Sequence, residues 1–446
     1  MAKLNKYKPY ESYTDTSAVW YKQKPAHWEC ERFKYHFIEK KKKNSTCLPA
    51  GAISFGEVIF KNEDNLSQDT KSSYQEVCAG EFLINPLNLN FDLKSLRTAL
   101  STIDVVVSTG YIVLQDCGFL HPRFARWLLQ QFDVSHMKTL GAGVRQTINY
   151  ADIGNSLFCR PTFEEQKIIA AFLDYETQKI DKLIERQQQL IELLKEKRQA
   201  VISHAVTKGL NPDVPMKDSG VEWLGEVPEH WSIKRLKHIS PKVGVGLVIN
   251  PSSYTRDEGV YFIFGGDVKE YGFDLGKTRK ISPKDSNNLL SSRLNNQDLV
   301  SVRVGYPGIT AVVTKDLEGS NCASVIIIRN GEFNSGWLCA AMNSWVGRQQ
   351  VELVSYGAAQ KQFNVADAVE FIFPVPPYDE QVIISNFVKN SLDKFDTVSL
   401  QAQVQIGLLQ ERRTALISAA VTGKIDVRDW VAPDMQDAEE PQETTV

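Results

Sequence analysis

Two stretches of this chain carry apolar residues at helical spacing for much longer than an ordinary globular helix requires. In the first stretch the apolar positions follow one another at spacings of three, four and seven, which return to one face of a helix. They are Ile180, Leu183, Leu190, Leu194 and Val201. The second stretch repeats the pattern with Phe395, Val398, Ala402, Leu409 and Leu416. Gly209 and Gly423 end the two runs, so we predict long helices over 161–208 and 376–424.

A different pattern fills the segments that precede these helices. Short runs rich in Val and Ile, each bounded by turn-forming residues, predict strands at 81–85, 104–108 and 111–115, and again at 298–302, 309–313 and 324–329. Shorter helical stretches are expected around 124–131 and 337–343. We therefore predict two mixed α/β bodies, at 1–160 and 227–375, joined through a turn-rich linker at 209–226.

The two halves of the chain are similar in sequence. Glu165-Gln166-x-Ile168-Ile169 recurs 215 residues later as Glu380-Gln381-x-Ile383-Ile384. The motif Leu193-Leu194-x-Glu196-x-Arg198 recurs at the same offset, and Pro25-x-His27-Trp28 recurs at an offset of 203 as Pro228-x-His230-Trp231. The chain thus contains an internal repeat of a body followed by a long helix. A helix with a narrow apolar seam needs a partner, and its own duplicate is the nearest one, although two ordinary amphipathic helices in a bundle would give a similar pattern.

Charge permits a nucleic-acid partner once it is divided along the chain. The 446 residues carry a net charge of −3, yet residues 1–160 hold 20 basic and 16 acidic side chains, a balance of +4. The last sixteen residues hold five acidic side chains and no basic one, and we expect 425–446 to be an acidic, disordered tail. No apolar run approaches the ~18 residues of a membrane span, and no apolar segment follows the first lysines as in a secretory signal. Seven cysteines without a CxxC pair fit reduced thiols in the cytoplasm, and the seven histidines form no metal-ligand cluster.

Three strings could indicate catalysis, and each lacks a required residue. In Gly272-Phe-Asp-Leu-Gly276-Lys277-Thr278 the spacing is one residue short of a phosphate-binding loop, and Pro283 stops the helix that should follow. Pro376-Pro377-Tyr378 resembles the tetrapeptide of DNA amino-methyltransferases, but Val375 cannot accept a hydrogen bond from an amino group. We expect these prolines to begin a helix instead. His27 and His230 occupy equivalent strings, so we interpret both as parts of the scaffold.

The junction between the halves resembles a known family. The string from Thr207 to Trp231, TKGLNPDVPMKDSGVEWLGEVPEHW, is similar to the central junction of specificity (S) subunits of type I restriction–modification systems, as are the Glu-Gln-x-Ile-Ile helix beginnings. The resemblance covers about 1–430. It implies two α/β target-recognition domains, each followed by a long spacer helix, with the two helices packed as an antiparallel coiled coil.

The resemblance also implies a function. A specificity subunit is not itself an enzyme: it reads a bipartite, asymmetric site on double-stranded DNA in the cytoplasm of a bacterium or archaeon, as part of phage defence. Two methyltransferase (modification) subunits dock on the spacer helices, through residues such as those of the seams above, and restriction/translocase subunits join them. S-adenosylmethionine, ATP and Mg would be bound by these partners, and no cofactor is expected in this chain. Two similar reading modules held by a rigid connector suit a split site. A scaffold or adhesin-like binding protein, and a methyltransferase fused to its own reader, are the alternatives.

The family has no motif for its base-reading residues, so these must be predicted from the chemistry of the loops. Two glycine-containing polar loops, 141–147 and 356–362, offer Arg145, Gln146, Gln360 and Lys361 for contacts with phosphates or base edges. Arg303 and Tyr306, in the segment 302–308, are similar candidates. The alternative for each residue is a solvated hairpin turn.

Overall fold

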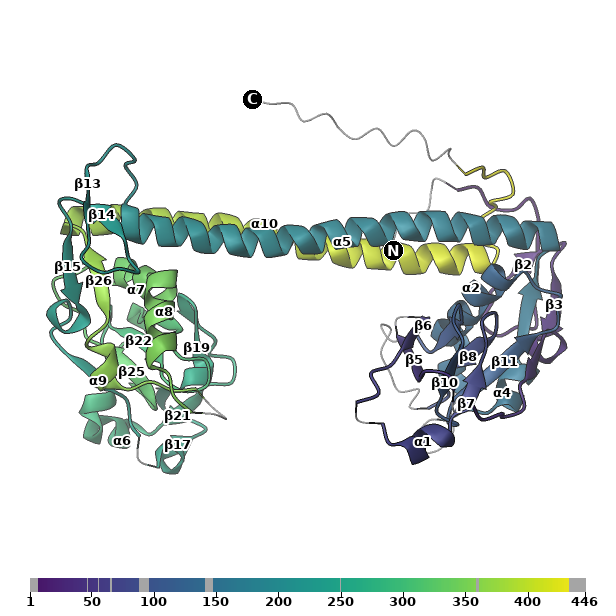
Figure 1. The fold of residues 1–446 in the computed structure, drawn as a ribbon, viewed down its shortest axis with the longest axis horizontal. Coiled ribbons are helices and arrows are strands. Elements are labelled where there is room, and N and C mark those ends of the chain that lie inside the picture. The colour runs from purple at the N-terminus through teal and green to yellow at the C-terminus, as the bar shows by residue number, and fades with distance from the viewer. Residues whose placement is uncertain are drawn as a thin grey trace. The chain divides into compact units, whose positions relative to one another are not determined.

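The chain folds into two units in a computed structural model, which describes residues 7–45, 47–54, 56–64, 66–87, 96–140, 147–248, 250–357 and 361–432. Unit 1 comprises 1–187 and 404–446, and unit 2 comprises 188–403. Both long helices, α5 (Phe163–Lys208) and α10 (Tyr378–Val421), pass from one unit into the other (Figure 1). Each unit contains the first half of one long helix and the second half of the other. The two helices therefore pair in antiparallel fashion.

Unit 1 is built on a six-stranded sheet whose order is β4-β11-β8-β9-β6-β5. All its neighbours are antiparallel except β6 and β9, which are parallel. Its strands are β4 (Phe37–Glu39), β5 (Gly51–Ser54), β6 (Glu57–Phe60), β8 (Phe82–Ile84), β9 (Thr98–Leu100) and β11 (Ile112–Asp116). Helix α2 (Pro122–Phe132) packs on β9 and contributes Phe124, Trp127 and Phe132 to the core.

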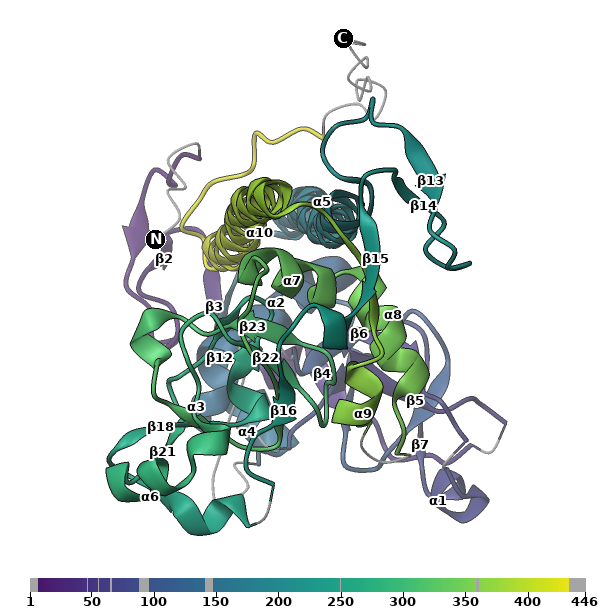
Figure 2. The same ribbon diagram turned by 90° about the vertical axis from the view of Figure 1, so that its left-hand side faces the viewer.

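Unit 2 contains two four-stranded sheets. The first is antiparallel with the order β16-β25-β22-β23, and the second has the order β17-β21-β18-β24. Their strands are β16 (Val243–Val245), β17 (Thr255–Arg256), β18 (Val260–Ile263), β21 (Arg279–Ile281), β22 (Leu299–Val302), β23 (Thr310–Val312), β24 (Asn321–Cys322) and β25 (Val325–Ile328). Helix α7 (Ser335–Asn343) packs on β23 and is followed by α8 (Trp345–Val354), as Figure 2 shows beside the first sheet.

Four strands in equivalent order form the centre of each unit. The order β4-β11-β8-β9 in unit 1 corresponds to β16-β25-β22-β23 in unit 2, with α2 and α7 on the equivalent strands β9 and β23. A two-stranded pair leads into each long helix: β3 (Glu29–Arg32) with β12 (Leu157–Arg160), and β15 (Ser232–Arg235) with β26 (Ile372–Val375). The predicted fold class, two α/β bodies each followed by a long helix in a pseudo-twofold repeat, is confirmed.

The remaining elements are short and lie outside this common centre. Apart from short 3₁₀ turns, they are β1 (Tyr13–Thr14), β2 (Lys24–Pro25), β7 (Gln75–Val77), β10 (Val105–Val107), β13 (Met216–Asp218), β14 (Glu226–Pro228), β19 (Val268–Lys269), β20 (Gly272–Phe273), α1 (Gln68–Ser72), α3 (Lys138–Leu140), α4 (Tyr150–Asn155), α6 (Pro283–Asn288), α9 (Val365–Ala368) and a π-helical turn at Asp133–Met137. The β13–β14 hairpin falls largely within the segment 209–226 that the sequence marks as a linker.

The repeated Glu-Gln pair at the start of each long helix ties the helix to its body. Glu165 is buried and accepts hydrogen bonds from Trp28 Nε1 (3.1 Å) and Tyr10 Oη (2.5 Å), and His27 Nε2 lies 3.0 Å from its carboxylate. The next residue, Gln166, donates to the carbonyl of Pro161 and accepts from the backbone N–H of His121, the residue before α2. The Glu165-Gln166 pair therefore ties together the N-terminal segment, the start of α5 and the start of α2.

Unit 2 repeats this arrangement. Glu380 accepts from Trp231 Nε1 (3.0 Å) and lies 2.8 Å from His230 Nε2. Gln381 donates to the carbonyl of Pro376 and accepts from the N–H of Asn334, the residue before α7. The interpretation of His27 and His230 as scaffold residues is confirmed, and so is the expectation that Pro376 and Pro377 lead into a helix.

The seam between the helices is a regular heptad pattern that the two helices share. The positions of α5 that follow this spacing and are not exposed are Leu173, Thr177, Ile180, Ile184, Gln187, Ile191, Leu194, Arg198, Val201 and Ala205. Adding 215 to each number gives positions of α10 that are likewise not exposed: Val388, Leu392, Phe395, Ser399, Ala402, Ile406, Leu409, Arg413, Leu416 and Ala420. The internal repeat therefore extends to every seam position.

Three of the predicted seam residues lie outside the seam. Leu183, Leu190 and Val398 are 41%, 38% and 40% exposed, whereas Ile180, Leu194, Phe395, Leu409 and Leu416 are buried or half-buried as predicted. Ile184 and Ile191, each one residue further along, take the inward positions of Leu183 and Leu190. The predicted pattern of apolar residues missed this because the seam also accepts polar side chains, such as Gln187 and Ser399.

The sequence prediction places the start of the disordered tail, at residue 425, too early. Ile425 and Val427 are buried, the N–H of Asp426 donates to the carbonyl of Lys8, and the ring of Trp430 packs edge-on against Phe172. Residues 425–430 are therefore part of unit 1. Residues 433–446 lie outside the described residues.

Candidate nucleic-acid interface

Two loops that the sequence singled out separately lie side by side in unit 2. The segment 303–308 joins β22 to β23, and 356–362 follows α8. The N–H of Gly305 donates to the carbonyl of Lys361 (3.0 Å), and the N–H of Phe363 donates to the carbonyl of Arg303 (3.3 Å). Gly305 has φ +94°, a conformation that favours glycine. The backbone thus brings the predicted residues Arg303, Tyr306 and Lys361 onto one surface.

The side chains on this surface are available to a ligand. Tyr306 is 81% exposed. The half-buried guanidinium of Arg303 makes no hydrogen bond or ion pair with any residue that the structure describes. Among the described residues, the Lys361 ammonium has one long contact, 3.5 Å from Glu352, between two exposed side chains. Exposed ion pairs are weak, so phosphate could displace Glu352 from the lysine at little cost.

The sequence prediction missed one residue of this surface. Tyr356 is 44% exposed, and its hydroxyl donates to Asn364 Oδ1 (2.9 Å). Gly357 follows with φ +105°. An aromatic residue next to a glycine in a polar loop was the available signal. Together Tyr306 and Tyr356 add apolar rings to a basic surface, a combination that suits contacts with bases as well as phosphates.

Unit 1 joins the equivalent loops in the same way. The N–H of Ile148 donates to the carbonyl of Pro86 (3.2 Å), just as Phe363 does to Arg303 in unit 2, and Phe363 is the repeat equivalent of Ile148. Pro86 follows β8 as Arg303 follows β22. The predicted residues Arg145 and Gln146, and Gln360 in unit 2, lie outside the described residues.

A buried carboxylate in unit 1 holds the segment that leads into β9. Asp133, in the π-helical turn after α2, is 2% exposed and accepts a hydrogen bond from the backbone N–H of Arg97 (2.7 Å). Burial raises the pKa of Asp133 to about 6, and the hydrogen bond from Arg97 opposes this only in part. Arg97 in turn donates from its guanidinium to the carbonyl of Leu87 (2.6 Å). Asp133 therefore anchors the segment that leads into β9.

The lysine run 40–43 in unit 1 is mostly engaged within the protein. Lys40 lies 2.8 Å from Glu81, and Lys43 lies 3.3 Å from Glu76. Burial alone would lower the pKa of Lys40, but the hydrogen bond and charge of Glu81 outweigh it and raise the pKa. Lys42 donates to the carbonyl of Thr109. The run therefore offers fewer free charges than its sequence suggests.

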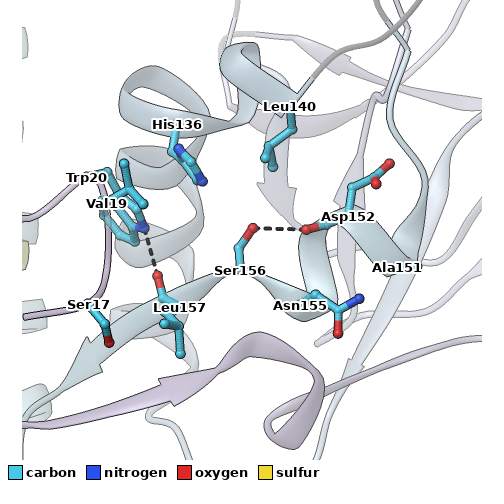
Figure 3. Close-up of a pocket in the computed structure, with 10 residues that line it drawn as sticks. All are labelled: Ser17, Val19, Trp20, His136, Leu140, Ala151, Asp152, Asn155, Ser156 and Leu157. Carbon is cyan, nitrogen blue, oxygen red and sulfur yellow. Dashed lines mark hydrogen bonds between the residues drawn. The ribbon is translucent and has the colours of Figure 1, made fainter.

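A shallow hollow of about 390 Å³ lies between the N-terminal segment and α4 of unit 1 (Figure 3). Several of its polar groups already have partners. Trp20 Nε1 donates to the carbonyl of Leu157, and the carboxylate of Asp152 caps α4 by accepting from the N–H of Asn149. Burial lowers the pKa of His136, which favours its neutral form. The carboxylate of Asp152 is thus already used to cap α4.

No constellation for metal binding or phosphate binding is present in the described part of the chain. No group of three or more potential ligands among its histidine, cysteine and acidic residues could hold a metal. Gly272 lies in β20, and the next helix, α6, begins only at Pro283, so the glycine-lysine string has no helix N-terminus to hold phosphates. None of the helices in the described ranges is long and apolar enough to span a membrane.

Comparison with known proteins supports the family resemblance. No family model matches the sequence. The chain is 25% identical over 297 residues to the type I restriction enzyme EcoBI specificity subunit of Escherichia coli, a match that covers 63% of this chain and 61% of that protein. It is 24% identical over 343 residues to the StySPI specificity subunit of Salmonella potsdam, covering 72% and 70% respectively. The match thus spans about three fifths of the E. coli relative.

Solved structures share the fold. A chain from a study of complex assembly and conformational transition of the type I R-M system superposes with a TM-score of 0.68 at 15% identity, covering 90% of this chain and 99% of that one. The HsdS subunit from Thermoanaerobacter tengcongensis superposes with a TM-score of 0.50 at 15% identity, covering 90% and 98%. The fold is therefore that of proteins with two α/β bodies and two long antiparallel helices. The resemblance to specificity subunits of type I restriction–modification systems is confirmed.

Proposed function

We propose that this chain reads a bipartite, asymmetric site on double-stranded DNA and directs methylation and restriction by partner subunits, without catalysing either reaction. The observation that carries this proposal is the repetition of one loop pair: 303–308 with 356–362 in unit 2, and the equivalent segments joined through Pro86 and Ile148 in unit 1. Two copies of one scaffold with different loop residues suit two half-sites of different sequence.

The helices supply the proposed surface for the partners. Leu193 and its repeat equivalent Leu408 are 62% and 53% exposed, while the adjacent Leu194 and Leu409 fill the seam. Repeated exposed leucines favour two copies of the same modification subunit, and restriction/translocase subunits would join that assembly. S-adenosylmethionine, ATP and Mg would be held by those partners in the cytoplasm.

The decisive experiment compares DNA modification before and after loop substitution. The full chain is expressed with its modification subunits, and methylated sites are mapped by sequencing. We expect one split sequence to be modified. The double variant Arg303→Ala/Lys361→Ala should weaken binding by about 1–3 kcal/mol per lost contact and reduce modification at that sequence.

The matched control is Lys234→Ala, which removes an exposed positive charge from β15, away from the loops. It should retain both affinity and modification. Equal affinity of the double variant and the control, at the same salt concentration, would remove these loops from the interface. No methylation that depends on the chain would favour a binding scaffold, and methylation by the chain alone would favour a fused methyltransferase.

A further inference from the structure

Unit 1 contains two cysteines that face each other across a strand pair. Cys30 on β3 is directly opposite Cys159 on β12 in the antiparallel register. Their Sγ atoms lie 2.8 Å apart, and Thr16 Oγ1 lies 3.0 Å from the first and 3.3 Å from the second. Both are free thiols. No other pair of cysteine sulfurs in the described part of the chain is in such contact.

The position of the pair in the ladder brings the two backbones close. The N–H of Phe33 donates to the carbonyl of Ser156, which makes those opposite residues a hydrogen-bonded pair. Hydrogen-bonded and non-hydrogen-bonded pairs alternate along an antiparallel ladder, and Cys30–Cys159 is three pairs away. It is therefore a non-hydrogen-bonded pair, with Cα atoms expected ~4.5 Å apart, within the ~4.4–6.8 Å range that a disulfide spans.

The second copy confirms the position and lacks the thiols. The register of β15 and β26 places Ile233 opposite Pro374, the repeat equivalents of Cys30 and Cys159. A proline has no N–H to donate, so it fits a non-hydrogen-bonded position. The scaffold therefore tolerates an apolar pair here, and the strand pairing does not require two cysteines.

We propose that Cys30 and Cys159 form a reversible oxidation site, at which a hydroperoxide converts the two thiols into a disulfide. Cys30 is half-buried and so within reach of a small oxidant, whereas Cys159 is fully buried. The accessible thiol reacts first, and the buried one resolves the product because it is already in contact.

The chemistry balances with hydrogen peroxide as the oxidant. The thiolate of Cys30 attacks one peroxide oxygen and the O–O bond breaks, which gives a sulfenic acid on Cys30 and hydroxide that is protonated to water. The sulfur of Cys159 then attacks the Cys30 sulfur. The S–S bond forms, the S–O bond breaks, and the hydroxyl leaves as water with the proton of Cys159. Burial raises the pKa of Cys159 to about 12, so this thiol carries its proton until that step.

The bond would close a long loop without moving the strands. The two residues are 129 positions apart in sequence, and β12 leads through Pro161 into α5. A disulfide here constrains the unfolded chain and leaves the existing register in place. Oxidation should therefore raise the thermal stability of unit 1, and unit 2 should be unaffected.

The test uses the full chain treated with graded hydrogen peroxide, then alkylated in denaturant, digested and analysed by mass spectrometry. We expect a peptide pair linked through Cys30 and Cys159 that disappears on treatment with dithiothreitol. The exposed Cys47 serves as the reference thiol for general oxidation. Peptides from unit 1 should also gain protection from hydrogen exchange on heating, and this gain should be reversed by the reductant.

Two variants complete the design. Cys159→Ser should accumulate a sulfenic acid on Cys30, detectable with dimedone, and lose the gain in protection. Cys30→Ile reproduces the residue of the second copy and should fold without responding to peroxide at this site. The proposal is overturned if wild-type chain shows no linked peptide at doses that oxidise Cys47. It is equally overturned if Cys30 proceeds to sulfinic acid, or if linkage leaves the protection of unit 1 unchanged.

Discussion

Replacement of Glu165 by alanine should destabilise unit 1 more than the equivalent change at Glu380 destabilises unit 2. Glu165 accepts from two donors that are themselves buried, Trp28 Nε1 and Tyr10 Oη, while His27 is partly exposed. In Glu380 the carboxylate is more exposed, 27% against 3%, and its one buried donor is Trp231.

The expected magnitudes follow from the donors left without partners. A buried donor that loses its acceptor costs ~1–3 kcal/mol, and water can replace the acceptor only where it has access. Glu165→Ala leaves two buried donors without an acceptor and should cost about 4 kcal/mol. Glu380→Ala leaves one buried donor without an acceptor and should cost about 2 kcal/mol. The two equivalent glutamates of the repeated motif should thus differ by about a factor of two in their contribution to the stability of their units.

The measurement is hydrogen exchange of the full chain, followed by mass spectrometry of peptides from each unit. It separates the two units, which a single melting curve would not. Glu164→Ala is the control, because Glu164 is exposed and pairs only with Lys167 in the next turn, so it should change stability by less than ~0.5 kcal/mol. Equal losses in Glu165→Ala and Glu380→Ala, or a comparable loss in the control, would refute this account of the motif.

Two further predictions concern charge and the helix seam. Because burial raises the pKa of Asp133 from 3.8 to about 6, the folded state favours its protonated form, and unit 1 should lose up to ~3 kcal/mol as the pH rises from 4 to 6. Asp133→Asn should remove this dependence in a pH series of unfolding curves; an unchanged pH profile would mean that the pKa of Asp133 is the same in the folded and unfolded states. Ile191→Asn, at a seam position that is 8% exposed, should destabilise unit 2 by about 2–4 kcal/mol, whereas Leu193→Asn, at a position that is 62% exposed, should have almost no effect on urea unfolding. The reverse order would refute the assignment of Ile191 to the seam.

The sequence revealed the repeat and the long helices because periodicity and duplication are local properties of the chain. It did not reveal which neighbouring apolar residue faces inward. Leu190 and Ile191 are equally compatible with helical spacing, and the choice depends on the curvature and partner of the helix, which are properties of the assembled pair. Comparison of both copies could have resolved this: Ile191 corresponds to Ile406, whereas Leu190 corresponds to Gln405.

The candidate interface was predictable only in part. Glycines and polar side chains marked the loops 303–308 and 356–362 separately. Their contact depends on backbone hydrogen bonds between residues far apart in the sequence, from Gly305 to Lys361 and from Phe363 to Arg303, and nothing in the sequence encodes that pairing. The role of the Glu-Gln motif was equally hidden, since its partners, Trp28 and the residue before α2, are distant in sequence.

The two ends of the described chain cover a core position of unit 1 whose equivalent in unit 2 is partly exposed. Phe172 is fully buried, with Tyr7 and Trp430 packed edge-on against its ring, whereas its repeat equivalent Phe387 is 38% exposed. We therefore expect two truncations to differ sharply. Deletion of 433–446 removes no contact among the described residues and should leave the stability of unit 1 unchanged.

Deletion of 425–446 also removes the buried side chains of Ile425 and Val427 and the cover over Phe172. At ~1.5–3 kcal/mol for each fully buried aliphatic side chain, this deletion should cost at least about 3 kcal/mol. Unfolding of the two truncated chains, followed by hydrogen exchange, measures the difference. Equal stability would show that the segment 425–430 contributes nothing to unit 1. A loss confined to the longer deletion would establish that the C-terminal segment completes the first body, as Ile425, Val427 and Trp430 indicate.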